Sequence, residues 1–363
     1  MHNDIISPAY FGYLHLPSIW VDEAIESDHF RNASSEKVFE FVHSCTLNCG
    51  ITVKARRDGF FLFDTHEWEP AAATLISQCN SNNGTKHRDV SSSTELAEQR
   101  SHVRAQLINA FQLCVHKARR EILGIQTSLG PEVGAEDVTY FYSDAIPHKL
   151  NFHSESSPYQ CFLAATHEQF FKREPKAIER RGTLTIEALV YAYSVLEKTI
   201  SNNYNASLRV VELIVRSIHR YSQNSMAESL IQSWTACELM LNYLWELYLN
   251  SKKGPAGTYE RMNRGRIKKL TGRDFSVSSV TELLELSGQL DFDLMKNLHE
   301  VRTNRNAWLH SLKEITPQIC GLSIKNATTL FKLVSDISFH TSLTRTLPST
   351  GGVRADLYPR RTM

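Results

Sequence analysis

Apolar residues recur every three to four positions through much of the second half of the chain. Between residues 183 and 339, successive segments show this helical period, and polar breaks such as "SNNYN" separate them. Most of these breaks are short, and short connections favour antiparallel neighbouring helices. The periodicity therefore predicts a helical bundle in this part of the chain.

Residues that cap helices mark where several of these helices begin. Ser225 with Glu228, and Ser279 with Glu282, form capping-box patterns, in which each side chain accepts a hydrogen bond from a backbone N–H of the first turn. The dipeptide Thr-Pro at 316–317 is an N-cap followed by proline at the first helical position. The expected helices cover 183–200, 206–221, 225–250, 279–288, 291–312 and 316–339.

Residues 1–76 are expected to form a small β-containing domain. Short runs rich in β-branched and aromatic residues, such as "KVFEFVHSC" and "GFFLFDT", are separated by Asn-Cys-Gly and Asp-Gly turn signals. The polar stretch 77–100 has too few large apolar residues to bury much surface, so we expect a linker or long loop there. An apolar stripe then predicts a helix over 101–124.

The remaining boundaries follow from weaker patterns. Within 125–182, "DVTYFYSD" favours a strand and "PYQCFLAATHEQFFK" a helix. Residues 343–363 contain turn formers and no apolar period, which indicates a mobile tail. Together the patterns predict an α+β chain, with a mixed, mostly helical middle region at 101–204 and a helical bundle at 205–342.

Charge and cysteine content exclude some classes of protein. Lys plus Arg number 40 and Asp plus Glu 39, so the bulk charge indicates neither a nucleic-acid binder nor a membrane-surface protein. The seven cysteines are scattered, which argues for reduced thiols rather than a disulfide framework. His43, Cys45 and Cys49 make a metal- or thiol-dependent site conceivable, but strand alternation explains these residues, so we expect no metal or cofactor.

We also expect no membrane association. The N-terminal residues lack the basic flank, apolar run and cleavage site of a signal peptide, and no segment approaches ~18 uninterrupted apolar residues. The expected location is therefore the cytoplasm.

An arginine interrupts the apolar stripe of the helix expected at 291–312. Arg305 lies in the middle of that stripe, where an unpaired guanidinium in a closed core would be costly. It must therefore be paired, exposed in a cleft or placed at a subunit interface, and Glu238 on the long helix is one candidate partner. The stripe consists of Leu294, Leu298, Val301, Arg305, Trp308 and Leu312.

Other polar residues gather beside Arg305. Asn306 follows it directly, Arg302 lies one turn before Asn306, and His310 lies one turn after. An arginine, a polar residue directly after it and a histidine four to six positions from the arginine resemble the motif of HEPN domains, helical bundles found in higher eukaryotes and prokaryotes. The resemblance covers 205–342.

The resemblance implies a metal-independent endoribonuclease that cleaves single-stranded RNA or tRNA to leave a 2',3'-cyclic phosphate and a 5'-hydroxyl. His310 would take the proton from a ribose 2'-OH or give one to the leaving 5'-oxygen. Arg305 would hold the scissile phosphate, and Asn306 would orient the histidine or the phosphate. Arg302 would support them, as would Glu238 in "SWTACELMLNYLW", which is similar to the family's long first helix.

Helical geometry favours a homodimer. Five residues separate Arg305 from His310, which places them about 140° apart on an ideal helix, so the two side chains do not share a face. In HEPN domains the motifs of two protomers meet at a symmetric interface, where groups from both copies would converge on one phosphate. We therefore expect a homodimer through the C-terminal bundle.

A local basic run offers contacts for RNA. The segment "RMNRGRIKKLTGR" at 261–273 holds no acidic residue, so it could bind phosphates without reading the base sequence. The alternative is a solvated basic loop without a ligand. The candidate RNA-binding residues are Arg261, Arg264, Arg266, Lys268, Lys269 and Arg273.

The setting follows from family analogy alone. Some HEPN toxins are controlled by modification of a tyrosine two residues after the histidine, but this chain has Leu312 there, which argues against that control. Prokaryotic HEPN nucleases with appended domains resemble antiviral abortive-infection proteins, which implies that the preceding residues sense a phage-derived trigger or a regulatory partner. The alternative is a non-catalytic HEPN-like module for dimerisation or for binding a nucleotide or RNA.

Overall fold

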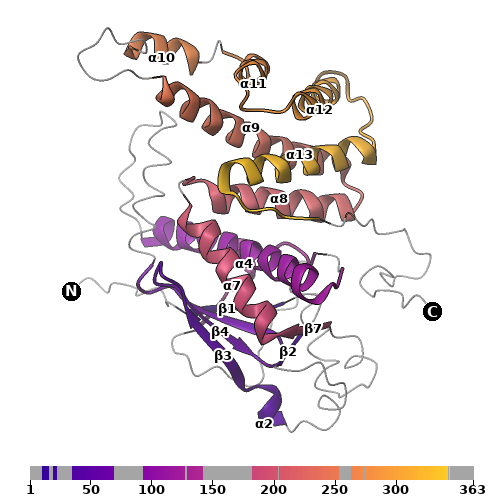
Figure 1. Cartoon of the computed structure of the whole chain (residues 1–363). Helices are drawn as coiled ribbons and strands as arrows, with labels where there is room; N and C mark the ends of the chain where they lie inside the picture. Colours follow the sequence, from indigo (N-terminus) through magenta and orange to yellow (C-terminus); the bar gives the residue numbers. More distant parts are fainter. Residues whose placement is uncertain are drawn as a thin grey trace. The chain divides into compact units, whose positions relative to one another are not determined.

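The chain is α+β: a small antiparallel sheet lies near the N-terminus, and most of the remaining described residues are helical (Figure 1). The computed structural model describes residues 10–15, 19–22, 35–68, 93–126, 129–141, 182–202, 204–252, 263–272, 275–341 and 343. The chain divides into two compact units, which are 1–208 with 346–363 and 209–345.

The main sheet of the N-terminal unit has the strand order β3-β4-β5-β1-β6, and every neighbouring pair is antiparallel. Gly50 and Gly59 have φ of +91° and +85°, and they occupy the turns that the Asn-Cys-Gly and Asp-Gly signals predict. The strands are β1 (Tyr10–Leu14), β3 (Phe41–Thr46), β4 (Thr52–Arg56), β5 (Phe60–Asp64) and β6 (Thr139–Phe141).

β6 pairs with β1, so the sheet is not confined to the first 76 residues. The short strand falls inside the segment "DVTYFYSD", where the sequence favours a strand. Its partner β1 lies far earlier in the sequence, and nothing in the local pattern of either strand specifies the other. The sheet therefore joins the β-rich segment and the middle region into one unit.

A second, two-stranded sheet pairs β2 (Ile19–Asp22) in parallel with β7 (Gly182–Thr185). The prediction of a helix from residue 183 is therefore wrong at its start. Thr183 and Thr185 are β-branched and suit a strand, and the Thr185 side chain caps the helix that follows by accepting from the Ala188 N–H at 3.2 Å. That helix is α7 (Ile186–Ser201).

Two helices cover one face of the main sheet (Figure 1). α4 (Ser93–Leu123) begins before the predicted start at 101, so residues 93–100 of the expected linker are helical. Phe111 on α4 packs edge-on against Phe61 and Phe63 of β5, with ring centroids 4.9 and 5.5 Å apart. α7 packs against α4.

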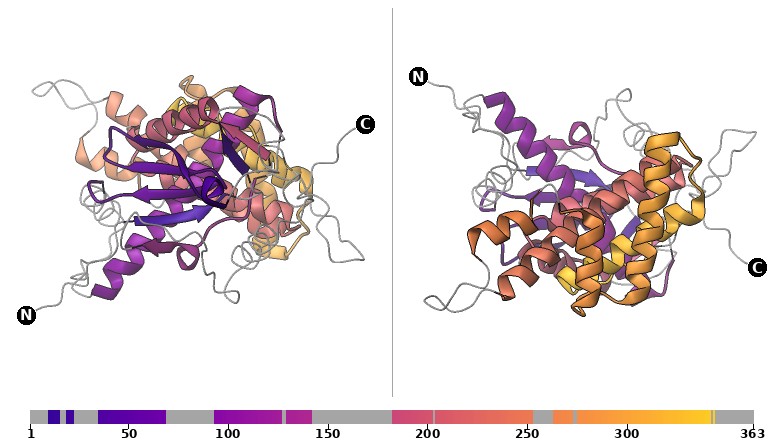
Figure 2. Two further views of the ribbon diagram at one scale, coloured as in Figure 1. Left: turned by 90° about the horizontal axis from the view of Figure 1, so that it is seen from below. Right: turned by 90° about the horizontal axis from the view of Figure 1, so that it is seen from above.

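The C-terminal unit is helical. α13 packs against α9 and α12, and α11 packs against α9 and α12, so these four helices bury their apolar faces on one another (Figures 1 and 2). The helices are α8 (Ser207–Ser222, whose residues from 209 belong to this unit), α9 (Met226–Ser251), α10 (Arg264–Leu270), α11 (Val277–Leu286), α12 (Phe292–Ser311) and α13 (Pro317–Ser335).

Both predicted capping boxes are wrong. Ser225 is the N-cap of α9 but its side chain makes no capping hydrogen bond, and Glu228 pairs instead with Arg220 at 3.2 Å. α11 starts earlier than predicted because Ser276 is its N-cap and accepts from the Ser279 N–H at 3.2 Å. Ser276 and Ser279 lie one turn apart, and either could cap this helix. The capping-box pattern of Ser279 and Glu282 does not show which serine does so.

The start of α12 and the start of α13 are confirmed. Asp291 caps α12 and Thr316 caps α13, with Pro317 at the first helical position. α12 ends at Ser311 because Leu312 adopts a left-handed conformation, with φ of +51°. α13 ends at Ser335 rather than at 339, since Asp336 is also left-handed.

Across the described ranges, no helix is both long enough and apolar enough to cross a membrane.

Candidate functional site

The apolar stripe of α12 is buried only in its first half. Leu298 and Val301 are 1% and 0% exposed, whereas Arg305 and Trp308 are half-buried and Leu312 is 79% exposed. The core beneath α12 therefore stops near Val301, and Arg305 lies at its rim. This position explains how a guanidinium can occupy the stripe: its charged end does not have to be enclosed.

Neither arginine of the motif region has a carboxylate partner among the described residues. Arg305 Nη1 donates to the Asn306 side-chain oxygen at 3.1 Å, and the Arg302 Nε is enclosed without a hydrogen-bond partner. Other arginines of the same unit do pair with acids, as Arg216 does with Glu212 at 2.9 Å. The C-terminal half of α12 therefore carries two positive charges that form no ion pair with an acid in the described part of the chain.

Glu238 on α9 does not bind Arg305. Its carboxylate accepts a hydrogen bond from the Trp234 indole N–H at 2.6 Å, one turn earlier on the same helix. This bond explains how an acidic residue fits the half-buried face of α9, since a partly desolvated carboxylate needs a donor. Among the described residues, Arg305 and Glu238 therefore form no ion pair, and the Glu238 carboxylate is bound by Trp234 instead.

His310 is exposed in the last turn of α12, and it lies on the same side of the helix as Asn306. One protomer brings Arg305 and Asn306 into contact, with Arg302 one turn away, but directs Arg305 and His310 about 140° apart. Two exposed leucines flank this end of the helix: Leu309 is 46% and Leu312 is 79% exposed.

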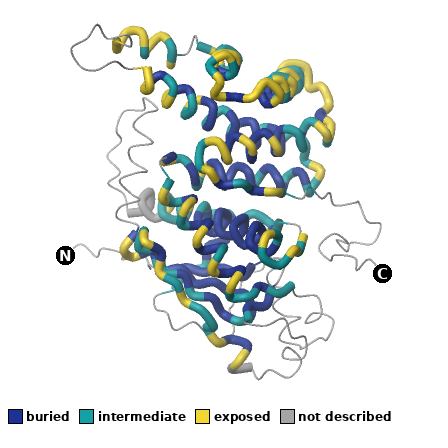
Figure 3. Tube along the Cα trace, viewed as in Figure 1, coloured by how far each residue is buried: buried dark blue, intermediate teal, exposed yellow. Residues whose placement is uncertain are grey.

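The basic run contributes a short, exposed helix, α10 (Figure 3). Its C-terminal end is anchored because the Trp245 indole N–H donates to the Leu270 carbonyl at 2.7 Å, and Trp245 stacks on Phe275. The exposed basic residues are Arg264, Arg266, Lys268 and Lys269. The other two candidates, Arg261 and Arg273, lie outside the described residues.

The segment with His43, Cys45 and Cys49 is strand β3 and the turn after it. The His43 ring stacks on the buried Tyr193, with ring centroids 5.7 Å apart. Burial, more than the Glu197 charge, raises the pKa of the Cys45 thiol, and burial also raises that of Cys49, which disfavours the thiolate that a nucleophile or metal ligand requires. Within the described part of the chain, no three His, Cys, Asp or Glu side chains are placed to hold a metal ion.

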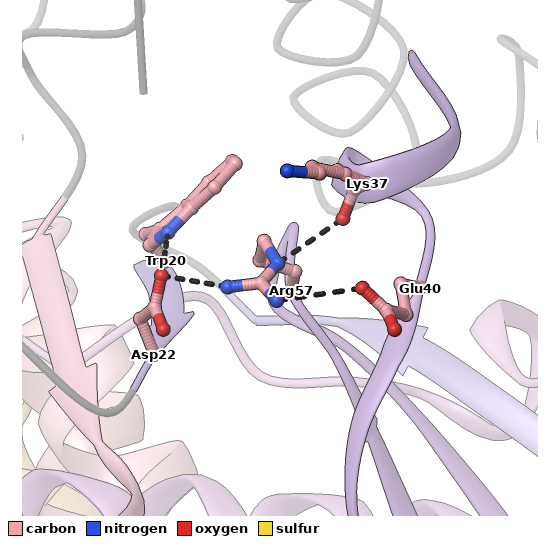
Figure 4. Close-up of polar contacts among 5 residues, drawn as sticks. All are labelled: Trp20, Asp22, Lys37, Glu40 and Arg57. Atoms are coloured by element: carbon pink, nitrogen blue, oxygen red, sulfur yellow. Dashed lines mark hydrogen bonds and ion pairs between the residues drawn. The ribbon is translucent and has the colours of Figure 1, made fainter. Parts of the chain in front are cut away.

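A polar cluster in the N-terminal unit, which the sequence patterns did not indicate, is centred on Arg57 (Figure 4). Its guanidinium donates to the Asp22 carboxylate at 2.6 Å, to the Lys37 carbonyl at 3.1 Å and to the Glu40 carboxylate at 3.4 Å. The Trp20 indole N–H donates to the same Asp22 carboxylate. The cluster joins β2 to the turn after β4 and to α2 (Ser35–Val38), and its charges are mutually satisfied, so we assign it a structural role.

Comparisons with protein-family models, with curated proteins and with solved structures found no match to this chain.

Proposed function

We propose that the chain is a metal-independent endoribonuclease of the HEPN type, active as a homodimer through the C-terminal helices. The observation that carries the proposal is the pair of arginines on α12, Arg302 and Arg305, which lack a carboxylate partner among the described residues and lie beside Asn306. Unneutralised guanidinium groups at the rim of a core are suited to an anionic ligand, and the scissile phosphate of RNA is such a ligand.

The same residues suit the chemistry. His310 takes the proton from the ribose 2'-OH, whose oxygen attacks phosphorus, and a histidine returns a proton to the departing 5'-oxygen. Arg305 offsets the charge that builds on the phosphate oxygens, while Asn306 orients the guanidinium to which it is hydrogen-bonded. The products are a 2',3'-cyclic phosphate and a 5'-hydroxyl.

A homodimer completes this site. Because Arg305 and His310 diverge in one protomer, the arginine of one copy and the histidine of the other would meet around one phosphate. Leu309 and Leu312 provide exposed apolar contacts next to His310 for the second copy. Glu238 would support the site only indirectly, through α9, because its carboxylate accepts the Trp234 indole N–H.

The exposed residues of α10 would bind the RNA backbone outside the cleavage site. Arg264, Lys268 and Lys269 make no ion pair with another described residue, so their charges are available to phosphates. By analogy with HEPN nucleases that carry appended domains, the protein would act in the cytoplasm in antiviral defence or as a toxin, and the N-terminal unit would respond to a phage-derived trigger.

The end chemistry of RNA tests the proposal. RNA from cells that express the wild type should gain 2',3'-cyclic phosphate ends, and purified protein should cleave single-stranded RNA or tRNA in excess EDTA. His310→Ala should abolish both effects without changing the helical circular dichroism signal, whereas His340→Ala, which removes an exposed histidine outside α12, should leave them unchanged. Equal cleavage by wild type and His310→Ala would refute the assignment.

The divergence of Arg305 and His310 within one protomer favours a second candidate, a non-catalytic HEPN-like module that dimerises or binds a nucleotide or RNA. This candidate predicts RNA binding that weakens in Arg305→Leu, together with RNA ends that are identical in cells expressing wild type and His310→Ala. Sedimentation of the purified chain separates the two further, because the nuclease requires a dimer in its active form.

A further inference from the structure

One buried face of α4 is polar. Gln112, His116 and Arg119 are spaced four and three residues apart, so they share one side of the helix, and they are 0%, 5% and 3% exposed. His15, at the end of β1, is 4% exposed. The burial of Arg119 and His15 is unusual, since arginine and histidine are seldom fully enclosed without a specific partner.

Two members of this group have unmet hydrogen-bonding groups. Both side-chain polar atoms of Gln112, and the Nε of Arg119, are enclosed and lack a hydrogen-bond partner among the residues that the structure describes. Buried amide and guanidinium groups are costly to leave unpaired, so native proteins satisfy them with protein groups, water or a ligand.

The same unit shows how a buried arginine is satisfied when its role is structural. Arg56, 1% exposed, donates from Nε and Nη2 to the two oxygens of Asp58 at 2.9 and 2.8 Å. Arg119 has no such carboxylate within the described ranges. Asp137, another buried acid, instead accepts the Gly134 backbone N–H at 2.8 Å.

The group around Arg119 is positively charged at neutral pH. Burial lowers the pKa of Arg119 to about 10, which still leaves the guanidinium protonated. Burial, then the charges of Arg119 and His116, lower the pKa of His15 to about 3, so the His15 ring is neutral. The charges that act on His15 are both positive, and no carboxylate contributes.

Gly182 makes room for the guanidinium. A Cβ atom at this first residue of β7 would lie 2.1 Å from Arg119 Nη2 and 2.9 Å from its Cζ. The glycine is needed for space rather than for backbone conformation, because its φ lies outside the left-handed region. The Arg119 guanidinium therefore extends from α4 to the backbone of β7 at Gly182.

We propose that Gln112, His116, Arg119 and His15 form a binding site for a phosphate group, either as free phosphate or as part of a small phosphate ester. A guanidinium, a carboxamide and two imidazoles supply several N–H donors together with the positive charge of Arg119, which matches an oxyanion with several acceptor oxygens. The site lies within the N-terminal unit, so this inference does not depend on the ribonuclease proposal.

Calorimetric titration of the full-length protein tests the site, with inorganic phosphate and adenosine monophosphate as separate probes in phosphate-free buffer at constant ionic strength. The wild type should bind one equivalent of at least one probe. Arg119→Met and Gly182→Ala should bind it at least about tenfold more weakly, because each removes or displaces the charged donor. Arg120→Met, which changes the half-buried neighbouring arginine, should bind as the wild type does.

Arg119→Met should fold, since a side chain of similar length replaces an unpaired buried charge. Gln112→Leu provides a second variant that removes the amide and leaves Arg119 in place, and it should also weaken binding. Tighter binding of adenosine monophosphate than of phosphate identifies an ester as the ligand, and the reverse order identifies free phosphate. No saturable binding of either probe to the wild type, or equal binding to the wild type and to folded Arg119→Met, would overturn the proposal.

Discussion

Arg305→Leu separates a binding role of this arginine from a structural one. Leucine continues the apolar stripe of α12 and has no charge. Arg305 is half-buried, and among the described residues its side chain makes one hydrogen bond, to the neighbouring Asn306 at 3.1 Å. Loss of such a bond at the rim of a core costs about 0.5–1 kcal/mol, which the added apolar contact offsets. We therefore expect the stability of the variant to stay within about 1 kcal/mol of the wild type.

Leu298→Ala is the matched reference, two turns earlier on the same stripe. Leu298 is 1% exposed, and truncation of a buried leucine costs about 2–5 kcal/mol. Urea unfolding of the full chain, followed by helical circular dichroism, should place the midpoint of Leu298→Ala well below that of Arg305→Leu. Because the chain has two units, the transition of the C-terminal unit must be resolved before the midpoints are compared.

RNA cleavage should respond in the opposite order. Loss of one donor to the phosphate typically lowers kcat about 100-fold or more, so Arg305→Leu should be nearly inactive although it is stable. Destabilisation of Arg305→Leu as large as that of Leu298→Ala, with cleavage by its folded fraction intact, would refute this reasoning and make Arg305 a structural residue.

Three further outcomes can be measured on the full chain. The free energy of unfolding should fall as the pH decreases from about 6.5 toward 3. In this range His15 takes up a proton in the unfolded state but not in the folded state, where its pKa is about 3. Thermal melts of His15→Gln should therefore depend less on pH than those of the wild type. Asn109→Leu should lower the free energy of unfolding by about 2–4 kcal/mol, since the Asn109 amide satisfies both backbone groups of Val133 at 2.8 and 2.9 Å in a buried position. Ser276→Ala should cost about 1 kcal/mol as a lost helix cap, whereas Ser225→Ala, whose side chain caps nothing, should cost less.

The start of a helix was predictable where the capping residue directly precedes the apolar run. Asp291 and Thr316 each directly precede a helical run, and both predicted helix starts are correct. Ser279 has a competitor in Ser276, and the Glu of its pattern, Glu282, lies 3.2 Å from His299 of α12. The contact between Glu282 and His299 joins two helices, so a pattern of neighbouring residues cannot predict it.

The candidate site was predictable in part. The helical period places Arg305 on the apolar stripe, but only the packing of neighbouring helices shows that the core ends at Val301 and leaves the arginine at its rim. The polar face with Arg119 was missed for the opposite reason. Polar residues on an amphipathic helix usually face solvent, and their burial here depends on β1 and β7, which come from distant parts of the sequence.

The strand pairings impose an order on folding during synthesis. β1 can pair with β5 once the chain has been made through Asp64, but its second partner, β6, follows only at Thr139–Phe141, and β2 has no partner strand until the chain has been made through Thr185. Until its partner has been made, β2 is an unpaired strand that could pair with another chain. The helices of the C-terminal unit pack on neighbours closer in sequence and emerge afterwards. In the growing chain, the segment that would cut RNA is therefore complete only after the strands of the N-terminal unit are available to pair.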